Sequence, residues 1–199
     1  AHLVAEWAVQ RAFQTANVPE MAPAVAPPAG IDGFEYSAGG RAAWQADVVT
    51  FAQTYAKAAR ALTGNGQSFA MPELKFNRFE RHGVTVLGVA DLVAWNAATK
   101  HAVIGDYKFG RSPVGCGTGA DPNEQVSAAA VLFDAQFANL GAQTFSLFVY
   151  QPRIRHGEAW QEIRSLDRAW LDTQAAKLDA ERAAVALAAD DVALGDTPT

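Results

Sequence analysis

Two charged residues, Asp106 and Lys108, stand two positions apart inside the apolar stretch VIGDYKFG at residues 103–110. Side chains two apart in a β-strand point to the same face of its sheet. A charge on a buried face costs free energy unless it is paired or binds a ligand. The stretch therefore predicts a partner or a ligand close to both side chains.

A second carboxylate reaches the same face through the turn that precedes this stretch. Two segments of strand composition flank the sequence NAATKH at residues 96–101. A short hairpin loop closed there pairs Trp95 with Ala102. Counting back along the two strands then places Asp91 opposite Asp106, and directly opposed residues share a face.

Both faces of this hairpin are expected to be covered, as in sheets with helices on each side. The face of the three charges carries apolar neighbours, which are Leu87, Val89, Val93, Trp95 and Ile104. The other face carries Val86, Ala90, Leu92, Val103 and Tyr107.

Two carboxylates and one lysine in such a setting leave a negative charge unbalanced. The carboxylates repel each other, and a divalent cation removes the conflict. All-oxygen donors without cysteine indicate Mg²⁺ or Mn²⁺. Such an ion activates water and neutralises phosphate charge, while a lysine holds the water or stabilises a developing oxyanion. The predicted chemistry is phosphodiester hydrolysis. The alternative is that Asp-x-Lys, a short pattern, forms an ordinary surface ion pair.

Length and composition fit one domain with a substantial core. The chain has 199 residues, of which 50% are hydrophobic, and a formal net charge of -5. That charge argues against non-specific binding of nucleic acid over the whole protein surface, but it is compatible with a local basic groove. No apolar run is long enough to cross a membrane. A single cysteine, Cys116, excludes internal disulfides and cysteine-built metal clusters and predicts a reducing, cytoplasmic compartment.

The elements that must position these residues follow from hydrophobic periodicity and turn signals. Helices are expected at 1–15, about 40–62, about 122–139 and from a Ser165 cap to about 189, with Asp167 in the first turn of the last. Strands are expected at 69–79, 84–95, 102–109, 144–152 (ended by Pro152) and 158–165. A proline-rich connector covers about 17–39 of the single domain 1–199. This order predicts an α/β fold with a mixed sheet between helices.

GVADLVAW followed by VIGDYKFG resembles the core of the PD-(D/E)XK nuclease superfamily, in which an aspartate on one strand is followed by acid-x-lysine on the next. More narrowly, it is similar to the RecB-like branch, which includes phage exonuclease-like proteins. AHLVAEW resembles the histidine helix of that branch, DPNEQVSAAAVLFDA its glutamine helix, and LFVYQPRIRHGEAWQEI a later strand pair of phage members. The resemblance implies the restriction-endonuclease-like fold, with a mixed central β-sheet flanked by α-helices.

The resemblance also implies roles for individual residues. The ligands of a Mg²⁺ or Mn²⁺ ion would be His2, Asp91, Asp106 and the backbone carbonyl of Tyr107. Lys108 would position or activate the water, and Gln125 would orient the substrate or the lysine and contact nucleic acid. Two positions depart from the common pattern, since Ala129 replaces a tyrosine and Asp106 replaces a glutamate.

These features predict a metal-dependent DNA nuclease of phage or prophage type, an exonuclease or an enzyme directed to single strands or ends. Its partners would be linear or single-stranded DNA ends and phage recombination or replication proteins in the bacterial cytoplasm, and an oligomer is open. Arg111 and Arg153 would line a phosphate track if their loops face the site, although basic loop residues are usually just solvated. Glu73 is either an extra acid near the metal or, more commonly, an exposed strand residue.

The alternative function belongs to another class. The chain would be a catalytically inactive nucleic-acid-binding or assembly module that keeps the nuclease fold. The acidic net charge and Ala129 favour this alternative. Retention of both aspartates and the lysine favours the enzyme.

Overall fold

The computed structural model describes residues 2–14, 38–64, 68–76, 79–81, 83–109, 114–117, 123–155 and 158–193. Its helices are α1 (His2–Gln14), α2 (Ala38–Thr63), α3 (Glu124–Gln136), the short 3-10 helix η1 (Ala138–Leu140) and α4 (Arg168–Ala193). Its strands are β1 (Ser68–Lys75), β2 (Phe79–Arg81), β3 (Val84–Val86), β4 (Val89–Asn96), β5 (His101–Tyr107), β6 (Thr144–Arg155) and β7 (Glu158–Asp167).

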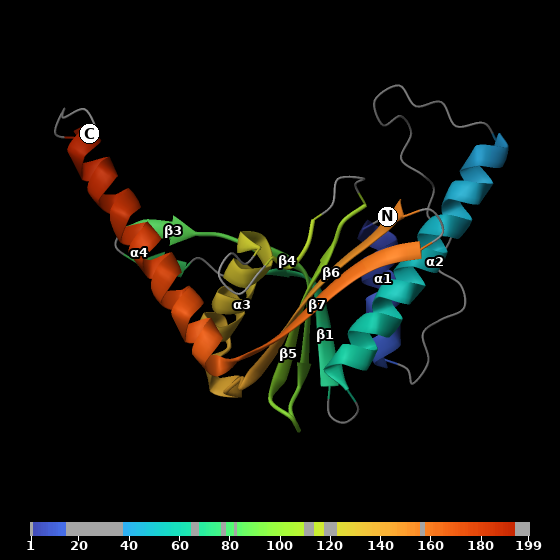
Figure 1. Cartoon of the computed structure of the whole chain (residues 1–199), viewed down its shortest axis with the longest axis horizontal. Coiled ribbons are helices and arrows are strands. Elements are labelled where there is room, and N and C mark those ends of the chain that lie inside the picture. Colours follow the sequence, from blue (N-terminus) through green and yellow to red (C-terminus); the bar gives the residue numbers. More distant parts are fainter. Residues whose placement is uncertain are drawn as a thin grey trace.

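Five strands form one mixed sheet in the order β1-β4-β5-β6-β7, and β2 pairs with β3 in a separate hairpin. The β5–β6 pair is parallel and the other pairs of the large sheet are antiparallel. Parallel strands need a crossover connection, and α3 provides it here. The predicted α/β fold with a mixed sheet between helices is confirmed (Figure 1).

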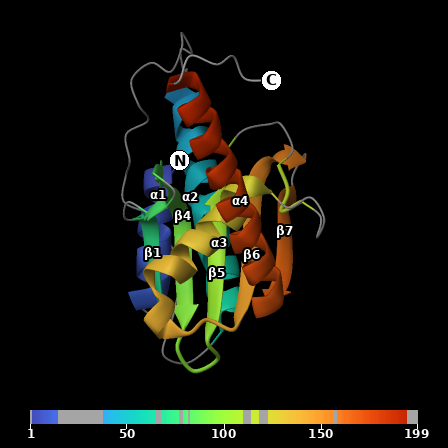
Figure 2. The ribbon, with the colours of Figure 1, turned by 90° about the vertical axis from the view of Figure 1, so that its left-hand side faces the viewer.

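Helices cover both faces of the sheet (Figure 2). The α2-side core contains buried residues of α1 and α2 together with Leu92, Val103 and Tyr107 of the sheet. The α3-side core contains residues of α3 and α4 together with Val93 and Ile104. Because both faces are covered, β5 reads as an apolar run rather than an alternating one. Asp106 is therefore a charge within a buried strand.

The predicted hairpin register is confirmed, since Trp95 pairs with Ala102 and Val93 with Ile104. The predicted faces hold for these four residues, but not beyond the start of β4. Val86 and Ala90 pack in the α3-side core, and Leu87 and Val89 are exposed rather than buried beside the charges. The expected strand 84–95 is broken at residues 87–88 into β3 and β4, and within β4 the alternation of faces changes between Ala90 and Leu92.

Several predicted bounds are wrong for related reasons. The expected strand 69–79 is divided between β1 and β2, and β6 continues through Pro152 to Arg155. The β6–β7 register is irregular between Gln151 and Arg155, where a residue without an N–H is tolerated. Most of the proline-rich connector lies outside the described residues, and α2 begins at Ala38.

The predicted cap of α4 is also wrong. Ser165 belongs to β7, and the Asp167 side chain accepts a 2.9 Å hydrogen bond from the backbone N–H of Trp170. Asp167 is thus the N-cap residue rather than a residue of the first turn. Within the described ranges, no helix combines the length and the apolar character needed to cross a lipid bilayer.

Candidate functional site

The two aspartates meet where the β4–β5 ladder ends. The pairing ends with Leu92 and Gly105, so Asp91 and Asp106 are the next residue on each strand beyond the last pair. There the Asp91 Oδ2 atom accepts a 2.8 Å hydrogen bond from the backbone N–H of Tyr107. The Asp91 carboxylate thus lies between the two strands, within one residue of Asp106.

An interruption in β4 turns Asp91 toward β5. Leu92 belongs to the α2-side core, whereas Ala90 belongs to the α3-side core. In a regular strand, residues two apart share a face, so the alternation breaks at Asp91. The neighbouring strand is irregular at the same level, because Glu73 falls opposite Asp91 in the β1–β4 register and has a φ of 51°. A third carboxylate group therefore stands on the strand beside Asp91.

Lys108, the residue that follows β5, links Asp106 of that strand to α3. Its Nζ atom is 2.9 Å from Asp106 Oδ1 and donates a 2.8 Å hydrogen bond to Gln125 Oε1. The Asp106 side chain is 4% exposed and that of Lys108 is 29% exposed. The carboxylate is therefore enclosed, whereas part of the lysine is accessible to a ligand from solvent.

The start of α3 places Gln125 within reach of the lysine. The Asn123 side chain caps the helix, since its Oδ1 accepts hydrogen bonds of 3.0 Å from Gln125 N and 3.3 Å from Val126 N. Asparagine is among the favoured N-cap residues because it satisfies backbone N–H groups that the helix leaves free. The cap fixes the backbone of Gln125 at the first turn.

The α2 side of the site is a wall of neutral phenols. Burial raises the pKa of Tyr55 well above its ordinary value, and the negative charges of Asp91 and Asp106 raise it further. Burial also raises the pKa of Tyr150 to about 12. Tyr55 packs edge-on against Tyr107, with 5.2 Å between ring centroids. These hydroxyls stay protonated near neutral pH, so the wall adds no charge and keeps water from that side of the aspartates.

The donor atoms fit a hard divalent cation. Asp91 and Asp106 offer carboxylate oxygens and Tyr107 a backbone carbonyl, which are the donors that Mg²⁺ and Mn²⁺ prefer. Cys116 is buried and donates to the backbone oxygen of Leu147 across 3.4 Å, so its sulfur lies in the core. Among the described residues, no three His, Cys, Asp or Glu side chains gather around one point. Mg²⁺ commonly keeps several waters and uses one or two carboxylates, which agrees with this set.

A family model matches residues 1–195, nearly the whole chain. The chain belongs to the DUF2800 family. This family is described as proteins of unknown function. No curated protein matches the chain.

In this DUF2800 chain, the structure brings together four of the residues singled out from the sequence, which are Asp91, Asp106, Lys108 and Gln125. The His2 backbone belongs to α1 and that of Arg153 to β6, but their side chains lie outside the described part of the chain. Arg111 lies outside the described residues altogether.

Asn123 and Tyr55 adjoin the site, whereas Ala129 lies in the core, and their sequence signals differ. Ala129 is buried in the α3-side core, so it faces the sheet rather than solvent. Asn123 was not singled out, although an asparagine followed by an acid before an apolar helix is a recognisable start signal. Tyr55 has no such signal, because it reaches the site only through the packing of α2 on the sheet.

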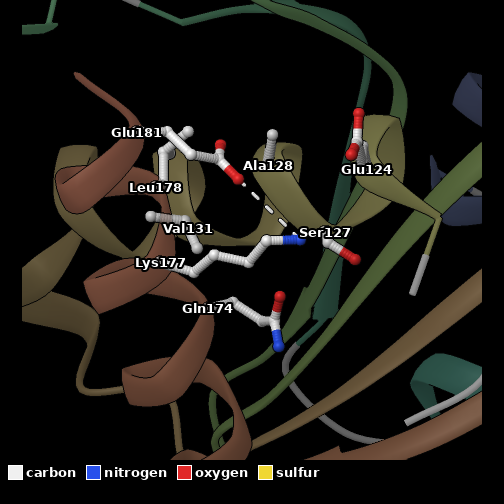
Figure 3. A pocket seen from close by; sticks show the side chains of 8 residues that line it. All are labelled: Glu124, Ser127, Ala128, Val131, Gln174, Lys177, Leu178 and Glu181. Atoms are coloured by element: carbon white, nitrogen blue, oxygen red, sulfur yellow. Dashed lines mark ion pairs between the residues drawn. The ribbon is translucent and has the colours of Figure 1, made fainter. Parts of the chain in front are cut away.

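A groove between α3 and α4 lies close to the site in sequence but differs from it in chemistry (Figure 3). Its lining residues are Glu124, Ser127, Ala128, Val131, Gln174, Lys177, Leu178 and Glu181. Lys177 pairs with Glu181 at 3.8 Å, which leaves the Glu124 carboxylate in excess. An excess of carboxylate repels phosphates, so this groove does not suit a nucleic-acid backbone.

Proposed function

We propose that this protein is a metal-dependent DNA nuclease that hydrolyses phosphodiester bonds at DNA ends or in single strands. The observation that carries the proposal is the linked set of Asp106, Lys108 and Gln125, with Asp91 bonded to the backbone N–H of Tyr107, the residue between Asp106 and Lys108. A lysine held by two partners beside a buried carboxylate is costly to build for stability alone. The mixed sheet flanked by helices is compatible with the PD-(D/E)XK fold, which we include in the proposal.

Lys108 is placed to stabilise the negative charge that develops on a phosphate during its hydrolysis. Asp106 forms an ion pair with the Lys108 ammonium group, and Gln125 accepts a hydrogen bond from it on the other side. A cation held in this way stabilises the charge that builds on the attacked phosphate without reorganising during the reaction. The neutral wall around Tyr55 strengthens this effect, because it keeps the local dielectric low.

The residues that would hold the ion are Asp91, Asp106 and the carbonyl of Tyr107, with His2 as the further ligand that the family resemblance implies. A bound Mg²⁺ or Mn²⁺ ion would supply a more acidic water and neutralise phosphate charge. Arg111, Arg153 and Gln125 are the proposed contacts to the DNA backbone. We also propose that the protein works with phage recombination or replication proteins in the bacterial cytoplasm.

The proposal is tested by digestion of labelled linear, circular and single-stranded DNA with Mg²⁺, with Mn²⁺ and with a chelator. We expect loss of linear and single-stranded substrate in the metal samples and none in the chelator. DNA binding measured alongside by fluorescence anisotropy separates the two function classes. Binding without cleavage of any substrate in either metal would identify an inactive nucleic-acid-binding module instead.

A further inference from the structure

We propose that Gln151 is a positioning residue: it holds the connection between Lys108 and α3 so that Gln125 stays on the lysine. Its effect on catalysis rests on the proposed nuclease function. The positioning itself is a property of the folded chain and can be measured without DNA.

Gln151 lies on β6, beside the end of β5 that carries the site. The parallel β5–β6 pairing matches Tyr107 with Tyr150, and the backbone N–H of Lys108 donates to the carbonyl of Tyr150 at 3.0 Å. Gln151 is the next residue on β6, and it is 1% exposed. A buried amide needs hydrogen-bond partners, whereas an apolar side chain would fill the same space without them. A glutamine at this position therefore indicates a specific bond.

That bond reaches the segment between β5 and α3. Gln151 Oε1 accepts a 2.6 Å hydrogen bond from the backbone N–H of Val114. The described part of this segment, residues 114–117, also contacts β6 through the 3.4 Å bond from Cys116 Sγ to Leu147 O. The segment is thus hydrogen-bonded to β6 at two points, the Gln151 side chain and the Leu147 carbonyl.

The same segment holds the first residue before α3. Asn123 donates from its backbone N–H to Cys116 O at 3.0 Å and from its side-chain Nδ2 to Gly115 O at 2.8 Å. Its Oδ1 caps Gln125 N. A continuous set of hydrogen bonds therefore runs from Gln151 through residues 114–117 and Asn123 to Gln125.

Gln125 depends on this set because its own side chain is exposed. An exposed glutamine in the first helical turn has several rotamers, so its contact with Lys108 depends on where the helix starts. Displacement of a positioned group by about 1 Å is enough to reduce a rate strongly. Gln151 thus acts on Lys108 indirectly, by fixing the start of α3.

The main test replaces Gln151 by methionine, which has a similar volume but no amide acceptor. We expect Gln151→Met to lower kcat for DNA cleavage about tenfold while the Kd for DNA changes less than about twofold. The control is Gln143→Met, because Gln143 is an exposed glutamine before the other end of β6. Its kcat should equal that of wild type.

A double-mutant cycle separates positioning from a general loss of folded protein. Without Gln125 nothing remains for Gln151 to position, so Gln151→Met should cost less than about twofold in a Gln125→Ala background. An equal loss in both backgrounds would overturn the proposal. If Gln151→Met does not fold, Asn123→Asp replaces it, because the aspartate keeps the cap and loses only the bond to Gly115.

The second readout needs no activity. In protein free of DNA, the side-chain amide resonance of Gln125 is recorded by NMR in wild type, Gln151→Met and Gln143→Met. We expect a shift of this resonance in Gln151→Met only. An unchanged Gln125 resonance would overturn the positioning whether or not wild type cleaves DNA. A shifted resonance in a wild-type protein that never cleaves DNA would support the positioning and reject the nuclease function.

Discussion

The ammonium group of Lys108 lies between the Asp106 carboxylate on β5 and the Gln125 amide on α3. Asp106 and Lys108 could be placed together from the sequence, because strand alternation is a local rule. The hairpin register also brought Asp91 near Asp106, but the break in alternation at Asp91 was not predicted. The contact with Gln125 was expected only through the family resemblance. It depends on the packing of α3 against the sheet, which no local pattern specifies.

Removal of one carboxylate tests the metal site at this scale. Asp106→Asn keeps the volume and removes a charged ligand of the proposed metal ion, so excess Mg²⁺ or Mn²⁺ should raise its Tm much less than that of wild type. A ligand that binds only the folded state at 100 times its Kd stabilises by about 2.7 kcal/mol. Thermal melts with chelator and with metal provide the measurement.

The control for this experiment is Asp134→Asn. Asp134 forms an ion pair with Arg168 at 2.6 Å, in the contact between α3 and α4. Its loss should lower the Tm equally with chelator and with metal, which leaves the metal-induced shift as in wild type. Equal metal-induced shifts in Asp106→Asn and wild type would show that Asp106 is not a ligand.

At the scale of elements, the ends of helices and strands depend on single side chains. The sequence pattern does not decide which of several suitable residues ends or caps an element. Ser165 and Asp167 are both good N-cap residues, and only the length of β7 decides between them. The expected strand breaks at residues 87–88, between β3, which pairs with β2, and β4, which pairs with β1. The irregularity at Asp91 lies where the pairing of β4 with β5 ends while its pairing with β1 continues. Such events depend on strand order, which hydrophobic periodicity does not contain.

The cap of α4 can be tested by two alanine substitutions. Asp167→Ala removes the acceptor for Trp170 N and should lower the free energy of unfolding by about 1 kcal/mol. Ser165→Ala changes an exposed residue of β7 and should cost less than about 0.5 kcal/mol. Urea unfolding of both variants is the measurement, and a larger loss for Ser165→Ala would contradict the cap assignment.

Close packing between β5 and α2 gives a second test at this scale. A Cβ atom at Gly105 would lie 2.7 Å from the Tyr55 hydroxyl and 3.1 Å from Leu92 Cβ. Gly105→Ala should therefore lower the free energy of unfolding by about 1–3 kcal/mol. Tyr55→Phe removes the hydroxyl, so Gly105→Ala should cost less in that background. Purely additive losses in urea unfolding would contradict the predicted contact.

At the scale of the whole molecule, the two ends of β5 carry different groups. The site lies at the Tyr107 end, and His101 lies at the other. The ring nitrogens of His101 contact Thr144 Oγ1 at 2.8 Å and Ser146 Oγ at 3.1 Å. Desolvation lowers the pKa of His101, against an opposing effect of a backbone hydrogen bond with Thr144. The folded protein therefore favours the neutral ring.

This lowered pKa makes the stability of the fold depend on pH. Below about pH 6.5 the unfolded chain takes up a proton that folded His101 accepts less readily. The stabilisation is thus complete above that pH and is lost as the pH falls through the lower pKa of the folded state. His101→Gln should lose less stability than wild type between pH 7.5 and 5.5 in urea unfolding. Equal losses would mean that His101 does not favour the neutral form.

The proposed nuclease site is tested most directly by comparing two lysines in one cleavage assay. Lys108→Ala removes the ammonium group at the site, whereas Lys177→Ala removes the one paired with Glu181 in the groove between α3 and α4. With Mn²⁺ and linear DNA, Lys108→Ala should cleave about 100-fold more slowly than wild type or worse, with DNA binding largely retained. Lys177→Ala should cleave at the wild-type rate. Cleavage by Lys108→Ala at the rate of Lys177→Ala would contradict the proposed site.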